Sequence, residues 1–203
     1  MAKKTISRKK KNQTRKIIFI VITVFISIGL LGTSIAWVLG GLDAEMLKAK
    51  KGDNRQDIEQ SIQERISVLE THVGSNPDDI ASMLDLAVAY ASNQQLDEAA
   101  ETYEAVLERE PKNVEAHLNA GIVYYYVSDF DNAKNHFETI IDVNPDYAEA
   151  YWWDAYTLAL GFEDYEGGIE KMEAFVKKTG QGTDAVKARQ TIEEWQGEIA
   201  GGR

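Results

Sequence analysis

The sequence predicts an all-α protein, in which stacked pairs of helices follow one long apolar segment. The three prolines of the 203-residue chain, Pro77, Pro111 and Pro145, lie 34 residues apart both times, and a fixed period in this range is typical of a repeat architecture. Apolar residues on both sides of these repeats recur every three or four positions, which indicates helix faces. Finally, residues 17–42 contain no charged side chain.

The uncharged segment is long enough to cross a membrane, because about 20 helical residues span a hydrocarbon core of about 30 Å. Eight basic residues precede it, and four follow it closely. Basic residues beside a span favour the cytoplasmic side. We therefore expect a single-pass protein of the cell membrane, with its N-terminus in the cytoplasm and the rest outside. A cleaved signal peptide is the alternative, although the apolar cores of such peptides are only about 7 to 15 residues long.

This interpretation divides the chain into four parts. We expect a basic cytoplasmic tail at 1–16, a transmembrane helix at 17–42, a linker at 43–55 and a helical domain at 56–200. The linker is expected because it is rich in lysine and contains Gly52 and Asn54, which disfavour a continuous helix.

Two complete repeat units align when they are numbered from Ile80 and Val114. Small residues at positions 8 and 20 would let two antiparallel helices approach closely, and aromatic residues at positions 11 and 24 would fill the space between helix pairs. A proline at position 32 would end the second helix. In the order of positions 8, 11, 20, 24 and 27, the matched residues are Ala87 and Gly121, Tyr90 and Tyr124, Ala99 and Ala133, Tyr103 and Phe137, and Val106 and Ile140.

This pattern resembles the tetratricopeptide repeat (TPR), which has a period of 34 residues. The resemblance implies a TPR α-solenoid with repeats at 80–113, 114–147 and 148–182. The third unit fits only if one residue is inserted in its turn, and it carries Asp154 where an apolar residue is usual. A leading helix with Ile58, Ile62, Ile66, Leu69 and Val73 on one face, and a closing helix at 183–200, would complete the stack.

The chain lacks the residues that several classes of function require. The chain has no cysteine, and its three histidines show no metal-binding spacing. His117 takes a core position of the repeat, so we expect it to serve packing. No phosphate-binding loop or nucleophile elbow is present. From Asp43 onward there are 14 basic and 33 acidic residues, which disfavours nucleic acid. We therefore predict no enzyme activity, no cofactor, no metal and no nucleic-acid partner.

The resemblance implies a concave groove lined by the first helix of each repeat. In TPR proteins that bind chaperone tails, Lys, Asn and Arg at positions 5 and 9 grip a carboxylate, whereas this chain has apolar and aromatic residues there. Exposed apolar patches usually mark binding sites, so we expect a protein or peptide segment with apolar side chains as the ligand. The candidate groove residues are Leu84, Val88, Leu118, Ile122, Tyr125, Tyr126, Trp152 and Tyr156.

Two functional hypotheses follow. In the first, the chain is a membrane-anchored scaffold or adaptor that holds a protein partner beside the membrane. Its layout is similar to that of bacterial TPR assembly factors in cytochrome c maturation and at the translocon, which would imply a role in the assembly or chaperoning of exported or membrane proteins. In the second, the chain is a self-associating structural protein and the groove is a homo-oligomer interface. The closing helix could also fill the groove.

Overall fold

The computed structural model of the chain describes residues 54–201, with side chains from Gln60 onward. This part contains eight α-helices, one π-helix and no strand, which confirms the all-α prediction. No helix among these residues is both long and apolar enough to cross a membrane. The predicted transmembrane helix at 17–42, the tail before it and most of the linker lie outside the described residues.

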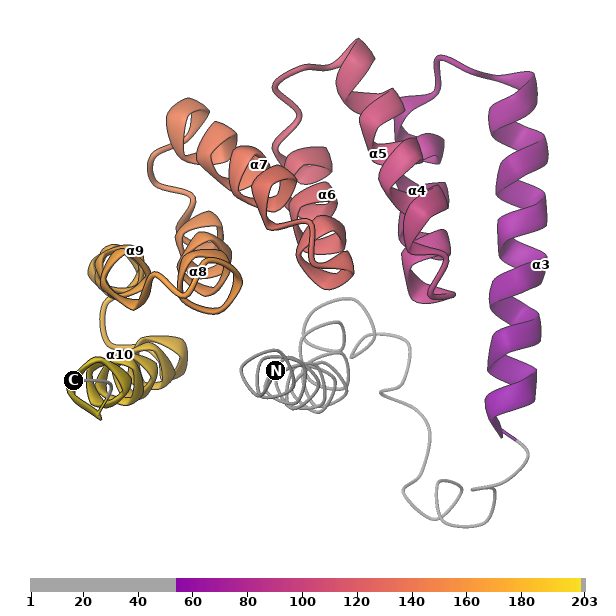
Figure 1. Cartoon of the computed structure of the whole chain (residues 1–203). Coiled ribbons are helices and arrows are strands. Elements are labelled where there is room, and N and C mark those ends of the chain that lie inside the picture. The colour runs from indigo at the N-terminus through magenta and orange to yellow at the C-terminus, as the bar shows by residue number, and fades with distance from the viewer. Residues whose placement is uncertain (1–53, 202–203) are drawn as a thin grey trace, which may run out of the picture. The chain divides into compact units, whose positions relative to one another are not determined.

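The helices pack in the order in which they occur in the sequence (Figure 1). Each repeat contributes two antiparallel helices joined by a short turn, and α4, α6 and α8 are the first helices of the three pairs. Asn54 and Arg55, which we expected in the linker, already belong to the leading helix. The elements are α3 (Asn54–Ser75), α4 (Ile80–Ser92), α5 (Leu96–Arg109), α6 (Val114–Val127), α7 (Phe130–Val143), α8 (Ala148–Tyr156), the π-helix η1 (Thr157–Gly161), α9 (Tyr165–Thr179) and α10 (Thr183–Gly201).

Acidic and amide side chains begin four of these helices by accepting a hydrogen bond from a backbone N–H of the first turn. Asp79 caps α4, Asn113 caps α6, Asp129 caps α7 and Asp164 caps α9. Such caps satisfy an N–H group that has no partner within the helix. After α9, Gly180 adopts a positive φ of 74° at the place where the first two repeats have proline, so a glycine ends this helix instead.

The predicted small positions lie where helices approach closely. A Cβ atom added to Gly121 would lie 2.6 Å from the ring of Phe137. One added to Gly168 would lie 2.7 Å from Cβ of Ala159 and 2.9 Å from the carbonyl oxygen of Ala155. The absence of a side chain at these two positions therefore permits the observed spacing of α6 from α7 and of α8 from α9.

The additional residue of the third repeat lies in a helix rather than in the turn where we expected it. Residues Thr157–Gly161 form η1, which continues α8. The hydrogen bonds of a π-helix span one more residue than those of an α-helix, from i to i+5, so one such turn accommodates an inserted residue. The insertion is thereby absorbed before the turn, and α9 packs against α8 as α7 packs against α6.

Asp154 is fully buried beside Lys171 of α9, whose Nζ atom lies 2.7 Å from Asp154 Oδ2. Neither carboxylate oxygen has a hydrogen-bond partner among the described residues, so we treat the contact as an ion pair. Burial raises the pKa of Asp154 against the lowering effect of Lys171. Burial lowers the pKa of Lys171, but the attraction of Asp154, together with Glu138 and Glu170, outweighs it and the net shift is upward. The unusual aspartate thus links α8 to α9.

The two flanking helices cover the ends of the repeats. Ile66 of α3 is buried against Leu86 and Ala89 of α4. At the other end, Ala188 and Trp195 of α10 join the core of the third repeat. Terminal helices of this kind protect the apolar end faces of a repeat stack.

A hydrogen bond recurs at the first two repeat junctions. The Tyr90 hydroxyl donates to Glu70 Oε1 at 2.7 Å, and the Tyr124 hydroxyl donates to Glu104 Oε1 at 3.1 Å. Burial and the neighbouring glutamate raise the pKa of each tyrosine to about 12. The equivalent residue of the third repeat is Leu158, which has no hydroxyl group.

We expect Tyr124→Phe to lower the free energy of unfolding by about 1 kcal/mol, a typical net value for one hydrogen bond. Urea unfolding followed by circular dichroism measures the change. Tyr90→Phe should have a similar effect, whereas Tyr151→Phe serves as a control because its exposed hydroxyl bonds to the carbonyl oxygen of Pro145, six residues earlier, and not to a glutamate of another helix. Equal stability of wild type and Tyr124→Phe would contradict this role of the bond.

Candidate protein-binding surface

The eight residues predicted to line a groove lie on the first helices, and we call them together the first-helix surface: Leu84, Val88, Leu118, Ile122, Tyr125, Tyr126, Trp152 and Tyr156. Leu118 and Tyr125 are each only 8% exposed, and the other six are partly buried. The surface is therefore continuous with the core rather than separate from it.

The structure gathers most of this surface around the second repeat. Leu118, Ile122, Tyr125, Tyr126 and Tyr156 belong to one apolar cluster. Leu84 and Val88 pack against the core of the first repeat, and Trp152 packs in that of the third. Tyr156 packs against the clusters of the second and the third repeat, so it joins these two repeats.

Trp153, which we did not include among the candidates, holds the centre of this surface together. Its ring lies edge-on to Tyr125 at 5.7 Å and to Tyr126 at 6.1 Å, and it stacks on Phe137 at 6.4 Å. The position numbers of the repeat assigned Trp152 to the groove and left Trp153 unassigned. The sequence signal that could have revealed it is the pair of adjacent tryptophans in the first helix of the repeat that follows three adjacent tyrosines.

The closing helix covers the third-repeat end of the surface. Trp152 packs against Phe175 of α9 at 5.0 Å, and Tyr156 packs against Trp195 of α10 at 5.4 Å. Burial raises the pKa of Tyr156 above its ordinary value. Tyr156 of the predicted groove thus packs against α10, and the two most buried of the eight candidates, Leu118 and Tyr125, lie in the second repeat.

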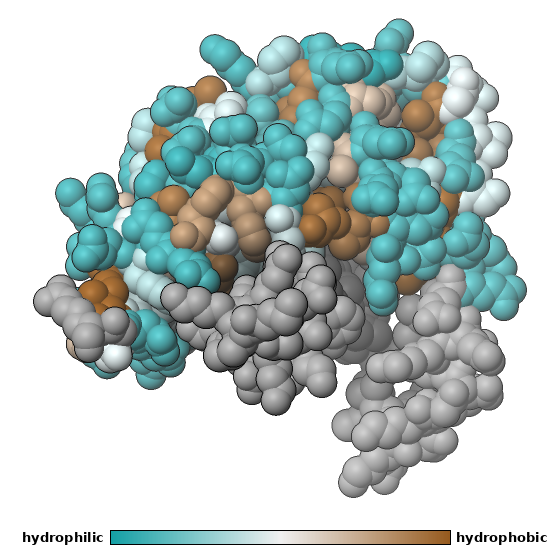
Figure 2. Space-filling view, viewed as in Figure 1, coloured by the Kyte–Doolittle hydropathy of each residue, from teal (hydrophilic) through white to brown (hydrophobic). Residues whose placement is uncertain are grey.

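The charges of the first helices all have one sign. Helices α4, α6 and α8 contain no lysine or arginine, but they carry acidic residues such as Asp85, Glu115 and Glu149. Figure 2 shows several separate hydrophobic patches on a mostly hydrophilic face. Apolar anchors among acidic groups suit a ligand with apolar side chains and disfavour an anionic one.

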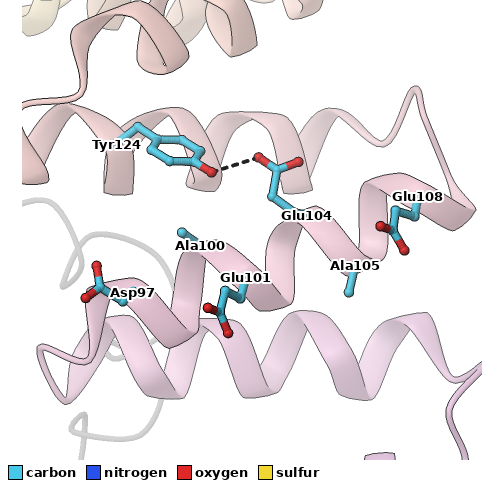
Figure 3. Close-up of a pocket in the computed structure, with 7 residues that line it drawn as sticks. All are labelled: Asp97, Ala100, Glu101, Glu104, Ala105, Glu108 and Tyr124. Atoms are coloured by element: carbon cyan, nitrogen blue, oxygen red, sulfur yellow. Dashed lines mark hydrogen bonds between the residues drawn. The ribbon is translucent and has the colours of Figure 1, made fainter.

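A hollow of about 500 Å³ lies along α5, where one face of the helix meets Tyr124 of α6 (Figure 3). Glu104 turns toward Tyr124, while the other acidic side chains are spread along the helix and do not converge. Within residues 54–201, no group of three or more acidic or histidine side chains is arranged to hold a metal ion. The residues that line the hollow are Asp97, Ala100, Glu101, Glu104, Ala105, Glu108 and Tyr124.

Sequence comparison identifies the repeats. Residues 87–127 match the family described as TPR repeat, and residues 118–183 match the family described as tetratricopeptide repeat. The chain carries tetratricopeptide repeats. This TPR domain is a scaffold for protein–protein interaction, and the helical solenoid predicted from the 34-residue period is confirmed. A search of curated protein sequences found no match.

Solved structures agree on the TPR fold. A crystal structure of MamA is 16% identical, covers 72% of this chain and 95% of its own, and has a TM-score of 0.57. MamA from Desulfovibrio magneticus RS-1 is 19% identical, covers 72% of this chain and 96% of its own, and has a TM-score of 0.57. A TPR protein from Parabacteroides merdae is 17% identical, covers 69% of this chain and 56% of its own, and has a TM-score of 0.62. At these identities the likeness shows the fold alone.

Proposed function

We propose that the chain is a membrane-anchored TPR adaptor, which binds an apolar segment of a partner protein on the first-helix surface without catalysing a reaction. The supporting observation is the aromatic cluster of Tyr125, Tyr126 and Trp153, flanked by Ile122, on first helices that carry no lysine or arginine. Tyrosine and tryptophan are frequent anchors at protein interfaces because they bury a large area at a small entropic cost.

In this proposal, residues 17–42 form the anchor and the TPR domain lies outside the cytoplasm. The support is the uncharged stretch of 26 residues with eight basic residues before it. An anchor raises the local concentration of the binding surface near membrane-bound partners. A role in assembling or chaperoning exported or membrane proteins fits this arrangement. Protease added to the outside of intact cells should remove the TPR domain; complete protection there would contradict this topology.

Site-directed crosslinking tests the proposed surface. A photoreactive phenylalanine analogue replaces Tyr126 of the full chain in its native membrane. A second variant of the same chain carries the analogue in place of Val143 of α7. Val143 is 39% exposed and lies on a second helix, so it controls for nonspecific neighbours. We expect a defined heterologous adduct at Tyr126 only, and we expect Ile122→Ala to reduce it severalfold.

Other results would reject the proposal or favour its alternative. Adducts of equal yield at both positions would show that the first-helix surface is not a specific binding site. An adduct between two copies of the chain would favour the self-associating structural protein. Tyr156 is unsuitable as the probe because it packs on both Trp152 and Trp195 and joins the clusters of two repeats, so its replacement would disturb both.

A further inference from the structure

A chain of hydrogen bonds joins the first repeat to the second. His117 Nε2 lies 3.0 Å from the Pro111 carbonyl oxygen, and His117 Nδ1 lies 2.9 Å from His136 Nδ1. His136 Nε2 lies 3.1 Å from Glu104 Oε1, which also accepts the Tyr124 hydroxyl. The rings of Tyr124 and His136 stack at 5.4 Å. These contacts connect α5, α6 and α7.

The chemistry of these atoms sets the number of protons in the chain of bonds. A carbonyl oxygen only accepts, so His117 must carry a proton on Nε2, and His136 must carry one on Nε2 when Glu104 is ionised. The two Nδ1 atoms face each other, and two lone pairs at 2.9 Å would repel. One further proton between them completes every bond. The two rings then hold one positive charge, which Glu104 balances.

A second additional proton does not fit this arrangement. It would place an N–H group on each of the two facing Nδ1 atoms and a positive charge on both rings, whose centroids are 5.2 Å apart. His117 is only 8% exposed and the side chain of His136 only 11%, so water screens this repulsion weakly. In agreement, burial lowers the pKa of His136, and the charge of His117 lowers it further, against the attraction of Glu104.

The surroundings offer little other compensation. On α5, Glu104 is the group that contacts His136, and the remaining acidic residues on the same face are Asp97, Glu101 and Glu108. On α6, Tyr124 stacks on the ring and His117 bonds to it. No charged group of α8 or of η1, which also pack on α7, contributes to the lowered pKa of His136 within the described chain.

We propose that His117, His136 and Glu104 form an acid-sensitive latch between the first two repeats, which is closed when the histidine pair holds one additional proton and opens when it takes up a second. An unfolded histidine titrates near pH 6.5, and His136 in the folded chain titrates lower. Between these two pKa values the unfolded chain binds more protons, so the free energy of unfolding decreases as the pH falls below about 6.5. Above about pH 6.5 the second proton is not taken up, so the stabilisation that the closed latch provides is not reduced by it.

Opening of the latch would alter the binding surface without unfolding the domain. Leu84 and Val88 lie before the latched junction, whereas Leu118 and Ile122 lie after it on α6. A loosened junction changes the distance between these two pairs. The latch therefore gives the stack a mechanism by which mild acid reduces binding to any ligand that spans both repeats. The latch itself does not depend on the proposed adaptor function.

Thermal unfolding of the full chain in detergent micelles at pH 7.5 and 5.5 tests the latch. The wild-type melting temperature should fall by several degrees at pH 5.5. His136→Phe keeps an aromatic ring beside Tyr124 but removes the titrating group, so it should melt lower at pH 7.5 and lose at least half of the pH-dependent fall. His72→Phe is the matched control, because His72 pairs with Asp79 at the surface; its fall should be at least as steep as that of wild type.

Proton NMR of the wild-type histidine rings gives an independent measurement, because the chain has only three histidines. We expect the His136 signal to titrate below pH 6.5, and amide exchange in α6 to increase severalfold more than in α9 between pH 7.5 and 5.5, after correction for the intrinsic pH dependence. An equal pH-dependent fall in wild type and His136→Phe would overturn the latch. So would a His136 signal that titrates at or above pH 6.5.

Discussion

Lys171→Ala is expected to lower the free energy of unfolding of the TPR domain by about 3 kcal/mol, because removing one partner of a buried ion pair leaves the other charge uncompensated. Asp154 is fully buried, and Lys171 Nζ at 2.7 Å is its ion-pair partner within the described chain. Chemical unfolding followed by circular dichroism measures the loss. The loss should be smaller at pH 4 than at pH 7, since an unpaired buried Asp154 takes up a proton more readily than an unfolded one.

A double variant separates the charge effect from the packing effect. Asp154→Leu combined with Lys171→Met replaces both charges with apolar groups, and the stability should return to within about 1 kcal/mol of wild type or exceed it. Lys187→Ala is the control for an exposed pair, because Lys187 and Asp184 contact each other at the surface of α10; its effect should be below about 0.5 kcal/mol. A loss below 1 kcal/mol for Lys171→Ala would show that Asp154 does not need its partner.

Gly168→Ala is expected to destabilise the third repeat by about 1 to 3 kcal/mol, the usual cost of inserting a methyl group where no space exists. The added Cβ would meet Cβ of Ala159 and the backbone oxygen of Ala155 at 2.7 Å and 2.9 Å. Neither atom is the end of a flexible side chain, so α9 must move away from α8 and η1. Thermal unfolding of the full chain and of the variant measures the effect.

Gly197→Ala provides the matched control, because the same substitution meets no atom within 4 Å in α10. Here the change should stabilise the helix by about 0.5 to 1 kcal/mol, since alanine loses less backbone entropy on folding than glycine. Opposite signs for the two variants would confirm that close contact, and not helix propensity, decides the effect at Gly168. Stabilisation by both variants would contradict the close packing of α8 and α9.

The features that recur every 34 residues could be predicted from the sequence. The small residues Gly121 and Gly168, the helix ends near the prolines and the flanking helices all follow from hydrophobic spacing and chain stiffness, which act locally. These properties recur in each unit, and a residue type found at the same position of two units is rarely there by chance. Trp152 and Tyr156 were assigned to the surface by the same repeat numbering.

Features that depend on a partner in another helix were not predictable in this way. Asp154 looked like a departure from the pattern, because nothing in the spacing indicates that Lys171 would lie beside it. His117 was expected to serve packing, and its bond to His136 depends on the rotation of two side chains on different helices. The inserted residue was expected in a loop, since hydrophobic periodicity does not distinguish a π-helix from a longer turn. Trp153 was missed because its neighbours belong to the preceding repeat.

The tyrosine–glutamate bonds at the first two junctions have a consequence for engineering longer arrays. Residues 114–147 supply both halves of this contact, with Tyr124 as the donor and Glu138 at the position equivalent to Glu104. Tandem duplication of this segment would therefore reproduce the bond at every new junction. Duplication of residues 148–182 would not, because Leu158 offers no donor. The middle repeat is the better module for extension.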